Sequence, residues 1–150
     1  MATSTVSRIT APALNTVRTD VALLIGRVVV GVVFIAHGWQ KLVTNGMPAT
    51  VDGFTAMGIP LPELSAWFTA LVEVVGGAAL VLGLLVPLAG LLLAVVSGGA
   101  LAFVHLENGL FATDGGYELV LVLLAASLML AGLGSGRFAL DPMVFGRRRR

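Results

Sequence analysis

Four long apolar segments dominate this sequence and restrict what it can fold into. A helix needs roughly 20 apolar residues to cross the hydrocarbon core of a membrane. Helices are also the only open-chain structures that satisfy their own backbone hydrogen bonds there. The chain is 57% hydrophobic and 11% charged, whereas a soluble domain carries roughly 25% charged residues. We therefore predict an all-α integral membrane four-helix bundle, with antiparallel helices at about 21–43, 64–85, 88–106 and 117–133.

Two polar tails flank this predicted transmembrane domain of residues 21–136. The N-terminal tail, residues 1–20, is rich in Ser and Thr. No small-residue cleavage site follows the first apolar segment, so we expect that segment to be retained and not removed as a signal peptide. The C-terminal tail, residues 137–150, is basic and ends in four arginines. Lys and Arg are absent from the loop at 107–116, so the positive-inside rule places both termini in the cytoplasm.

The connections between the apolar segments differ in length. A tight turn at Pro87 predicts that the second and third helices are antiparallel neighbours. The loop that precedes Pro62 is longer, and in it Val51, Phe54 and Met57 are spaced by three. This spacing indicates a short amphipathic helix that lies at the membrane interface.

Ionisable residues inside the apolar segments are the main functional signal, because such groups are costly in lipid unless they face protein, water or each other. Arg27, His37 and Lys41 share one sector of the first helix at about 100° per residue. Glu73 lies near the middle of the second helix, too deep to reach either surface, so it needs a cation, hydrogen bonds or a proton. Compared with Glu73, Arg27 should lie nearer the cytoplasmic side of the membrane. His37 and Lys41 lie on the outer side, so either group could partner Glu73.

Two further ionisable residues lie at the outer ends of the last two helices. His105 ends the third helix and Glu118 begins the fourth. At this depth they should converge with His37 and Lys41. We expect a polar pocket in the outer half of the bundle, with Glu73 at its floor.

Simpler interpretations of these residues stay open. Lys41 could be an interfacial anchor, and Arg27 could extend inward or pair with Glu73 structurally. His105 and Glu118 could be ordinary helix-end residues. The two histidines could also ligate one haem, or form a metal site with carboxylates. We disfavour haem and metal, because two histidines on two helices also arise by chance.

Several motifs occur in order along the chain, at residues Arg27 and Gly31, "HGWQKL" at 37–42, "GFTAMGIPLP" at 53–62, "VEVVGGAALVLGLLVP" at 72–87 and "GGYELVLVLLAASLMLAGLG" at 115–134. Together they resemble the DoxX-like family of small membrane proteins of the bacterial cytoplasmic membrane, over about residues 20–142. The resemblance implies a multi-pass four-helix bundle associated with redox chemistry. Relatives are similar to the small membrane subunit of a thiosulfate:quinone oxidoreductase, and others accompany thiol- or oxidant-handling enzymes.

A quinone site would suit the polar residues, with His37 or Lys41 hydrogen-bonding a quinone oxygen and Glu73 or Glu118 relaying its proton. The chain has no cysteine, which excludes disulfides, thiol catalysis and iron–sulfur clusters held by this chain. It also has no recognisable cofactor motif. A complete oxidoreductase would therefore need a partner subunit.

We accordingly predict a membrane subunit of a quinone-linked redox system, in which Glu73 and His37 are catalytic. The expected quinone-binding residues are Arg27, His37, Lys41, Glu73, His105 and Glu118. Its expected partners are membrane lipids and an oxidoreductase subunit, and a homo-oligomer is also compatible. No nucleic acid is expected, because arginines after a membrane helix indicate topology and anionic lipid. The alternative is a non-catalytic membrane scaffold or small-molecule carrier whose buried charges set helix packing.

Overall fold

A computed structural model describes residues 16–144 and 146 of the chain. Most of the polar N-terminal tail and the arginines at 147–150 lie outside the described residues. Within the described part the chain is helical and contains no strand, so the all-α prediction is confirmed. The helices are α1 (Thr16–Trp39), α2 (Met47–Ala56), α3 (Pro62–Leu82), α4 (Val86–Ala100), α5 (Glu118–Leu133) and α6 (Asp141–Val144), with π-helical turns η1 (Gln40–Thr44) and η2 (Leu101–His105) and 3₁₀ turns η3 (Leu106–Asn108) and η4 (Ala112–Asp114).

Three helical stretches are long and apolar enough to cross a membrane: Val17–Thr44, Pro62–Leu82 and Val86–Asn108. The fourth expected span, α5, has 16 residues. At 1.5 Å per residue α5 is about 24 Å long, against about 30 Å for the hydrocarbon core. The structure also contains the short helix expected in the loop before Pro62, which is α2 and begins at Met47, earlier than the spacing of apolar residues suggested.

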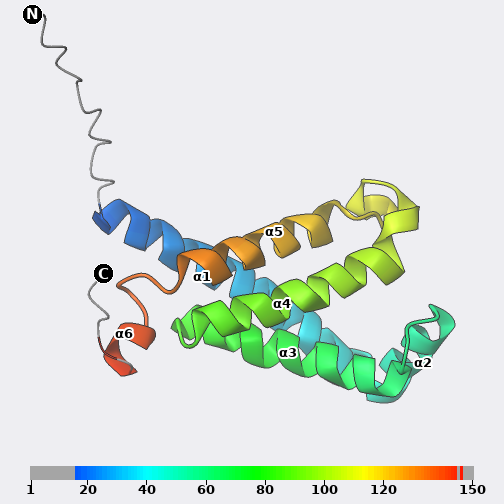
Figure 1. The fold of residues 1–150 in the computed structure, drawn as a ribbon. Helices are drawn as coiled ribbons and strands as arrows, with labels where there is room; N and C mark the ends of the chain where they lie inside the picture. Colours follow the sequence, from blue (N-terminus) through cyan, green and yellow to red (C-terminus); the bar gives the residue numbers. More distant parts are fainter. Residues whose placement is uncertain (1–15, 145, 147–150) are drawn as a thin grey trace, which may run out of the picture.

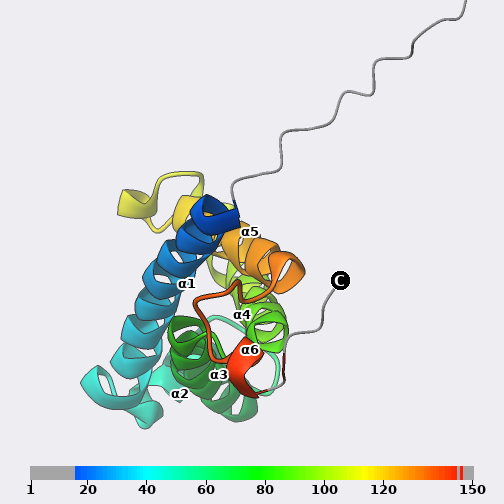
Figure 2. The same ribbon diagram turned by 90° about the vertical axis from the view of Figure 1, so that its left-hand side faces the viewer.

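The long helices pack as neighbours, with α1 against α3, α3 against α4, and α4 against α5 (Figures 1 and 2). Gly31 on α1 and Gly77 on α3 mark a close approach between two of these helices. A Cβ atom built on Gly31 would lie 2.6 Å from the carbonyl oxygen of Gly77, and the reciprocal distance is also 2.6 Å. Small residues therefore bring the two backbones together, as helices in lipid require in the absence of a hydrophobic drive.

The two ends of the bundle differ in construction (Figure 1). At one end, here called the loop end, α2 and the segment 106–117 project beyond the long helices. At the other, here called the terminal end, α1 begins, α5 ends and α6 follows. The tight turn between α3 and α4, residues 83–85, also lies at the terminal end.

The segment 134–144 folds back across the terminal end and is held there by hydrogen bonds (Figure 2). The backbone N–H groups of Leu140 and Asp141 donate to the carbonyl oxygens of Leu82 and Gly83, at 3.2 and 3.0 Å. The Asp141 carboxylate accepts hydrogen bonds from the N–H groups of Leu85 and Val86, at 2.6 and 3.2 Å. Asp141 thus satisfies free donors at the start of α4, the role that an N-cap residue usually fills.

Candidate functional site

An ion pair between a buried carboxylate and a half-buried lysine joins η1 to α3 near the loop end. Nζ of Lys41 lies 2.6 Å from Oε2 of Glu73 and donates a hydrogen bond to it. The Glu73 side chain is 8% exposed and that of Lys41 is 22% exposed. Judged by their expected depth in the membrane, Arg27, His37 and Lys41 were all candidate partners of Glu73. In the structure the partner is Lys41.

Two local features place Lys41 over Glu73. Gly38 lies against the turn of α3 that carries Glu73, since a Cβ atom on Gly38 would be 3.0 Å from the Glu73 Cβ. The chain then widens into the π-helical turn η1, and such turns occur frequently at functional sites. The hydroxyl of Thr50 on α2 lies 3.1 Å from the Lys41 carbonyl oxygen, so α2 fastens this widened turn.

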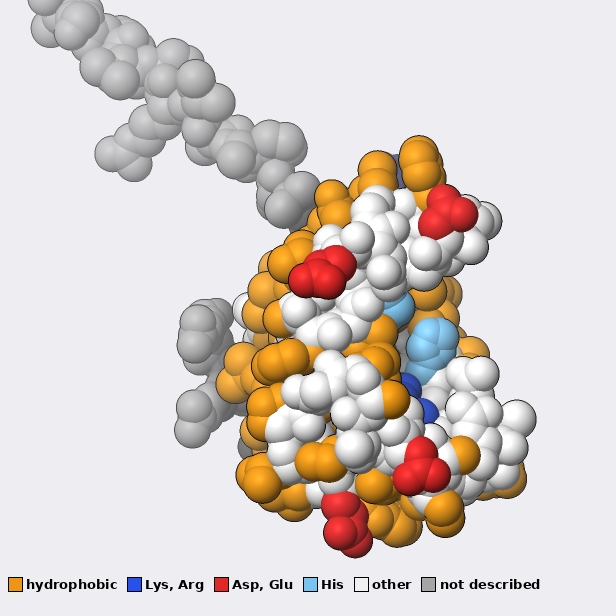
Figure 3. All heavy atoms as spheres, turned by 90° about the vertical axis from the view of Figure 1, so that its right-hand side faces the viewer, with side chains coloured by type: hydrophobic (Ala, Val, Ile, Leu, Met, Phe, Trp, Pro, Cys, Tyr) orange, Lys and Arg blue, Asp and Glu red, His pale blue; other side chains and the backbone are white. Residues whose placement is uncertain are grey.

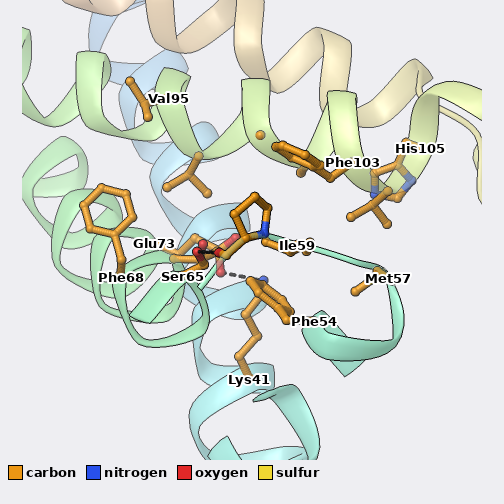
Figure 4. Close-up of a pocket in the computed structure, with 16 residues that line it drawn as sticks. Lys41, Phe54, Met57, Ile59, Ser65, Phe68, Glu73, Val95, Phe103 and His105 are labelled. Carbon is orange, nitrogen blue, oxygen red and sulfur yellow. Dashed lines mark hydrogen bonds and ion pairs between the residues drawn. The ribbon is translucent and has the colours of Figure 1, made fainter. Parts of the chain in front are cut away.

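A cavity of about 450 Å³ opens on one side of the ion pair (Figure 4). Apolar side chains from α2 and the segment after it, from α3, and from α4 with η2 surround it, and the ion pair forms its polar floor. Phe54, Phe68 and Phe103 come from three different elements, and Figure 4 shows them around the space above Lys41 and Glu73. This first cavity therefore combines aromatic walls with one charged hydrogen-bonding group of each sign.

A second, smaller cavity of about 210 Å³ adjoins the first at the ion pair. The two cavities share five lining residues: Lys41, Glu73, Val96, Ala100 and His105. The second cavity's own lining includes His37 from α1 and Ser97 from α4, together with residues of the loop before α5. The ion pair thus forms part of the wall of both cavities.

Four of the six predicted site residues gather here, namely His37, Lys41, Glu73 and His105. Nδ1 of His105 lies 2.7 Å from the carbonyl oxygen of Gly115, which orients the ring at the cavity wall. Among the residues described, no group of three or more His, Asp or Glu side chains is arranged to hold a metal ion.

Arg27 was expected at this site, and the structure places it elsewhere. Its guanidinium is fully buried at the terminal end, where it donates hydrogen bonds to the carbonyl oxygens of Leu80, at 3.1 Å, and Phe138. Arg27 precedes His37 by ten residues, or about 15 Å of helix, which is too far for both to contact one small ligand. Its role in the structure is to hold the segment after α5.

Glu118 was also expected in the pocket and lines neither cavity. Its Oε1 accepts a hydrogen bond from the N–H of Ala112 at 2.7 Å, so it braces the loop that precedes α5.

Conversely, sequence reasoning missed Ser97 and the three phenylalanines of the first cavity. Ser97 had a visible signal, a single hydroxyl within an apolar helix, whereas the phenylalanines look like ordinary lipid-facing residues until the helices are assembled.

Comparison with known proteins agrees with the resemblance seen in the sequence. The family model described as DoxX matches residues 22–106, more than half of the chain. A curated relative from Bacillus subtilis (strain 168), named "Putative oxidoreductase CatD", is 35% identical over 126 residues, which cover 84% of this chain and 89% of the relative. No solved structure matches the chain.

Proposed function

Because this chain belongs to the DoxX family, we propose that it is the membrane subunit of a quinone-linked redox system in the bacterial cytoplasmic membrane. The observation that carries this proposal is the Lys41–Glu73 ion pair, which forms the floor of an aromatic-walled cavity between membrane-length helices. A quinone is a flat apolar ring with two oxygen atoms, and these features match such a cavity.

The dimensions support a ligand of this class. The first cavity, at about 450 Å³, falls within the roughly 300–1,000 Å³ of small-molecule sites. Its side chains are mainly apolar with a few placed polar groups, the composition usual for such sites. It lies between α3 and α4 beside α2 and is lined by exposed residues such as Phe68 and Phe103, so an isoprenoid tail could leave it toward lipid.

The ion pair supplies complementary hydrogen-bonding groups. Lys41 has three N–H donors, of which one is directed to Glu73 and a second to the His37 carbonyl oxygen at 3.5 Å, so the third can hydrogen-bond a ligand oxygen. The Glu73 carboxylate can accept a proton from a bound hydroxyl or return one to a bound carbonyl oxygen. A bound quinone would supply the capacity to take up two electrons and two protons. Lys41 and Glu73 would orient its ring and manage one of those protons, and a partner oxidoreductase subunit would exchange the electrons.

The proposed orientation places the loop end outside the cytoplasm. Arg18 and Arg137 lie at the terminal end, and the segment 106–117 has no Lys or Arg. By the positive-inside rule the terminal end, with both chain termini, is cytoplasmic. All four long helices would then cross the membrane, with α5 completed by the adjoining loop. The quinone cavity would lie in the outer half of the bundle.

Mass spectrometry of lipid extracts from gently purified protein tests the proposal. We expect wild type to retain a quinone and Glu73→Gln to lose it while still eluting as a folded protein. Glu118→Gln is the matched control, because Glu118 lies at the same end but lines neither cavity. Absence of quinone from wild type, with Glu73→Gln merely unstable, would contradict the proposal and support a scaffold in which the pair sets helix packing.

A further inference from the structure

The second cavity differs from the first in size. Its volume of about 210 Å³ is below the roughly 300 Å³ at which small-molecule sites begin. A single water needs only about 10–15 Å³ of such space and two to four polar partners. The cavity is therefore too small for a quinone and large enough for several waters.

Polar groups of both kinds line this second cavity. Glu73 offers acceptors, Lys41 offers donors, and the His37 ring offers one of each when neutral. Ser97 adds a hydroxyl that is almost completely buried, at 2% exposed for the residue. No described protein group hydrogen-bonds this hydroxyl. Burying an unsatisfied hydroxyl is unfavourable, so its position on a polar cavity points to water as its partner.

The loop end of the molecule is hollowed where this cavity lies. Ala112, Gly115 and Gly116 form the wall on the side of the loop. Viewed from the loop end, Figure 3 shows a hollow with histidine side chains and a basic side chain inside it, between two rims of mainly uncharged atoms. Polar groups of the cavity can thus be reached from the end of the bundle without passing through the aromatic walls of the first cavity.

We infer that the second cavity is a water-filled passage that connects the Lys41–Glu73 pair to the aqueous phase at the loop end, with Ser97 positioning water inside it. The pair would then contact a ligand on one side and water on the other. Protons would reach Glu73 through this passage, past His37 and Ser97. Only this use of the passage in quinone chemistry rests on the proposed function; its hydration does not.

The natural absence of cysteine allows a direct test of hydration. Ser97→Cys places one thiol on the second cavity. Ser127→Cys is the matched control, because Ser127 on α5 is also fully buried with no hydrogen-bond partner among the described groups but lines neither cavity. A membrane-impermeant cationic methanethiosulfonate is applied to the outside of cells, and labelling is read by intact-protein mass spectrometry.

We expect Ser97→Cys to be labelled and Ser127→Cys to stay unlabelled over the same period. Val120→Cys, which lines the second cavity but not the first, serves if Ser97→Cys does not fold. Equal labelling of Ser97→Cys and Ser127→Cys, or labelling of neither Ser97→Cys nor Val120→Cys, would overturn the inference. The result does not depend on quinone, whose retention is measured separately, so failure of one proposal can be told from failure of the other.

Proton access is tested by infrared spectroscopy at a pH low enough to protonate Glu73, with its carboxyl band identified by its loss in Glu73→Gln. In D₂O we expect Ser97→Ala to slow exchange of this proton by about tenfold, the effect of losing one hydrogen bond to water. Ser127→Ala should exchange like wild type. Unchanged exchange in Ser97→Ala would show that protons reach Glu73 by another route.

Discussion

Gly38 of α1 lies directly against Glu73 of α3, so the backbone of one helix rests on the turn that carries the buried carboxylate of the other. A Cβ atom at Gly38 would be 2.7 Å from Cγ2 of Val74, 2.9 Å from the carbonyl oxygen of Ala70 and 3.0 Å from the Glu73 Cβ. One of these neighbours is backbone and cannot move aside. This close approach is what allows Lys41, less than one turn later, to reach Glu73.

Gly38→Ala should therefore push α1 away from α3 and lengthen the Lys41–Glu73 contact. We expect a loss of about 1–3 kcal/mol of stability, typical of overpacking, with loss of bound quinone. Thermal unfolding in detergent and quinone content measure the two effects. Gly26→Ala is the control on the same helix, because a Cβ there meets nothing within 4 Å. A Gly38→Ala protein as stable as Gly26→Ala would refute this account of the interface.

Breaking the ion pair should cost more than removing it. Lys41→Met leaves the buried Glu73 without its cation, and we expect destabilisation of about 3–5 kcal/mol. The double variant Lys41→Met/Glu73→Met replaces both charges with apolar side chains and should recover most of that loss. A double-mutant cycle of unfolding free energies measures the coupling. If the double variant were less stable than Lys41→Met, the pair would not be the interaction that satisfies Glu73.

Arg27 should behave as a structural residue and not as part of the quinone site. Arg27→Met removes the hydrogen bonds to Leu80 and Phe138, each worth about 1.5–3 kcal/mol for a charged donor. We expect faster trypsin cleavage after Arg137, in the segment that Arg27 holds, with quinone still bound at low temperature. Arg18→Met, at an exposed position of the same helix, should change neither. Loss of quinone from Arg27→Met without faster cleavage would contradict this prediction and would indicate that Arg27 belongs to the quinone site.

Asp141 should stabilise the start of α4 from a distance in sequence. Asp141→Ala removes the acceptors of the Leu85 and Val86 N–H groups, and loss of a capping side chain costs about 0.5–2 kcal/mol. Asp52→Ala, at an exposed position on α2, is the comparison and should have no measurable effect. Differential scanning fluorimetry in detergent compares the two. Equal melting temperatures would show that the backbone hydrogen bonds of the segment suffice without Asp141.

The sequence predicted the helices well because their signal is local. Apolar length marked both ends of α3 to within three residues, and three of the expected spans reach membrane length in the structure. The short helix α2 was also foreseen from its spacing of three. The π-helical turn η1, which carries Lys41, was not foreseen. This turn is held by a hydrogen bond from Thr50 of α2, a contact that local sequence does not reveal.

The sequence by itself determined that this chain is a helical membrane protein of the DoxX family and that its buried charges need partners, since both follow from composition, motif order and the cost of charge in lipid. Tertiary structure decided which partners they have. Lys41 pairs with Glu73, whereas Arg27 binds carbonyl groups 53 and 111 residues away in the chain. Depth along one helix axis is readable from sequence, but the rotation of each helix and the return of the C-terminal segment depend on packing between distant residues.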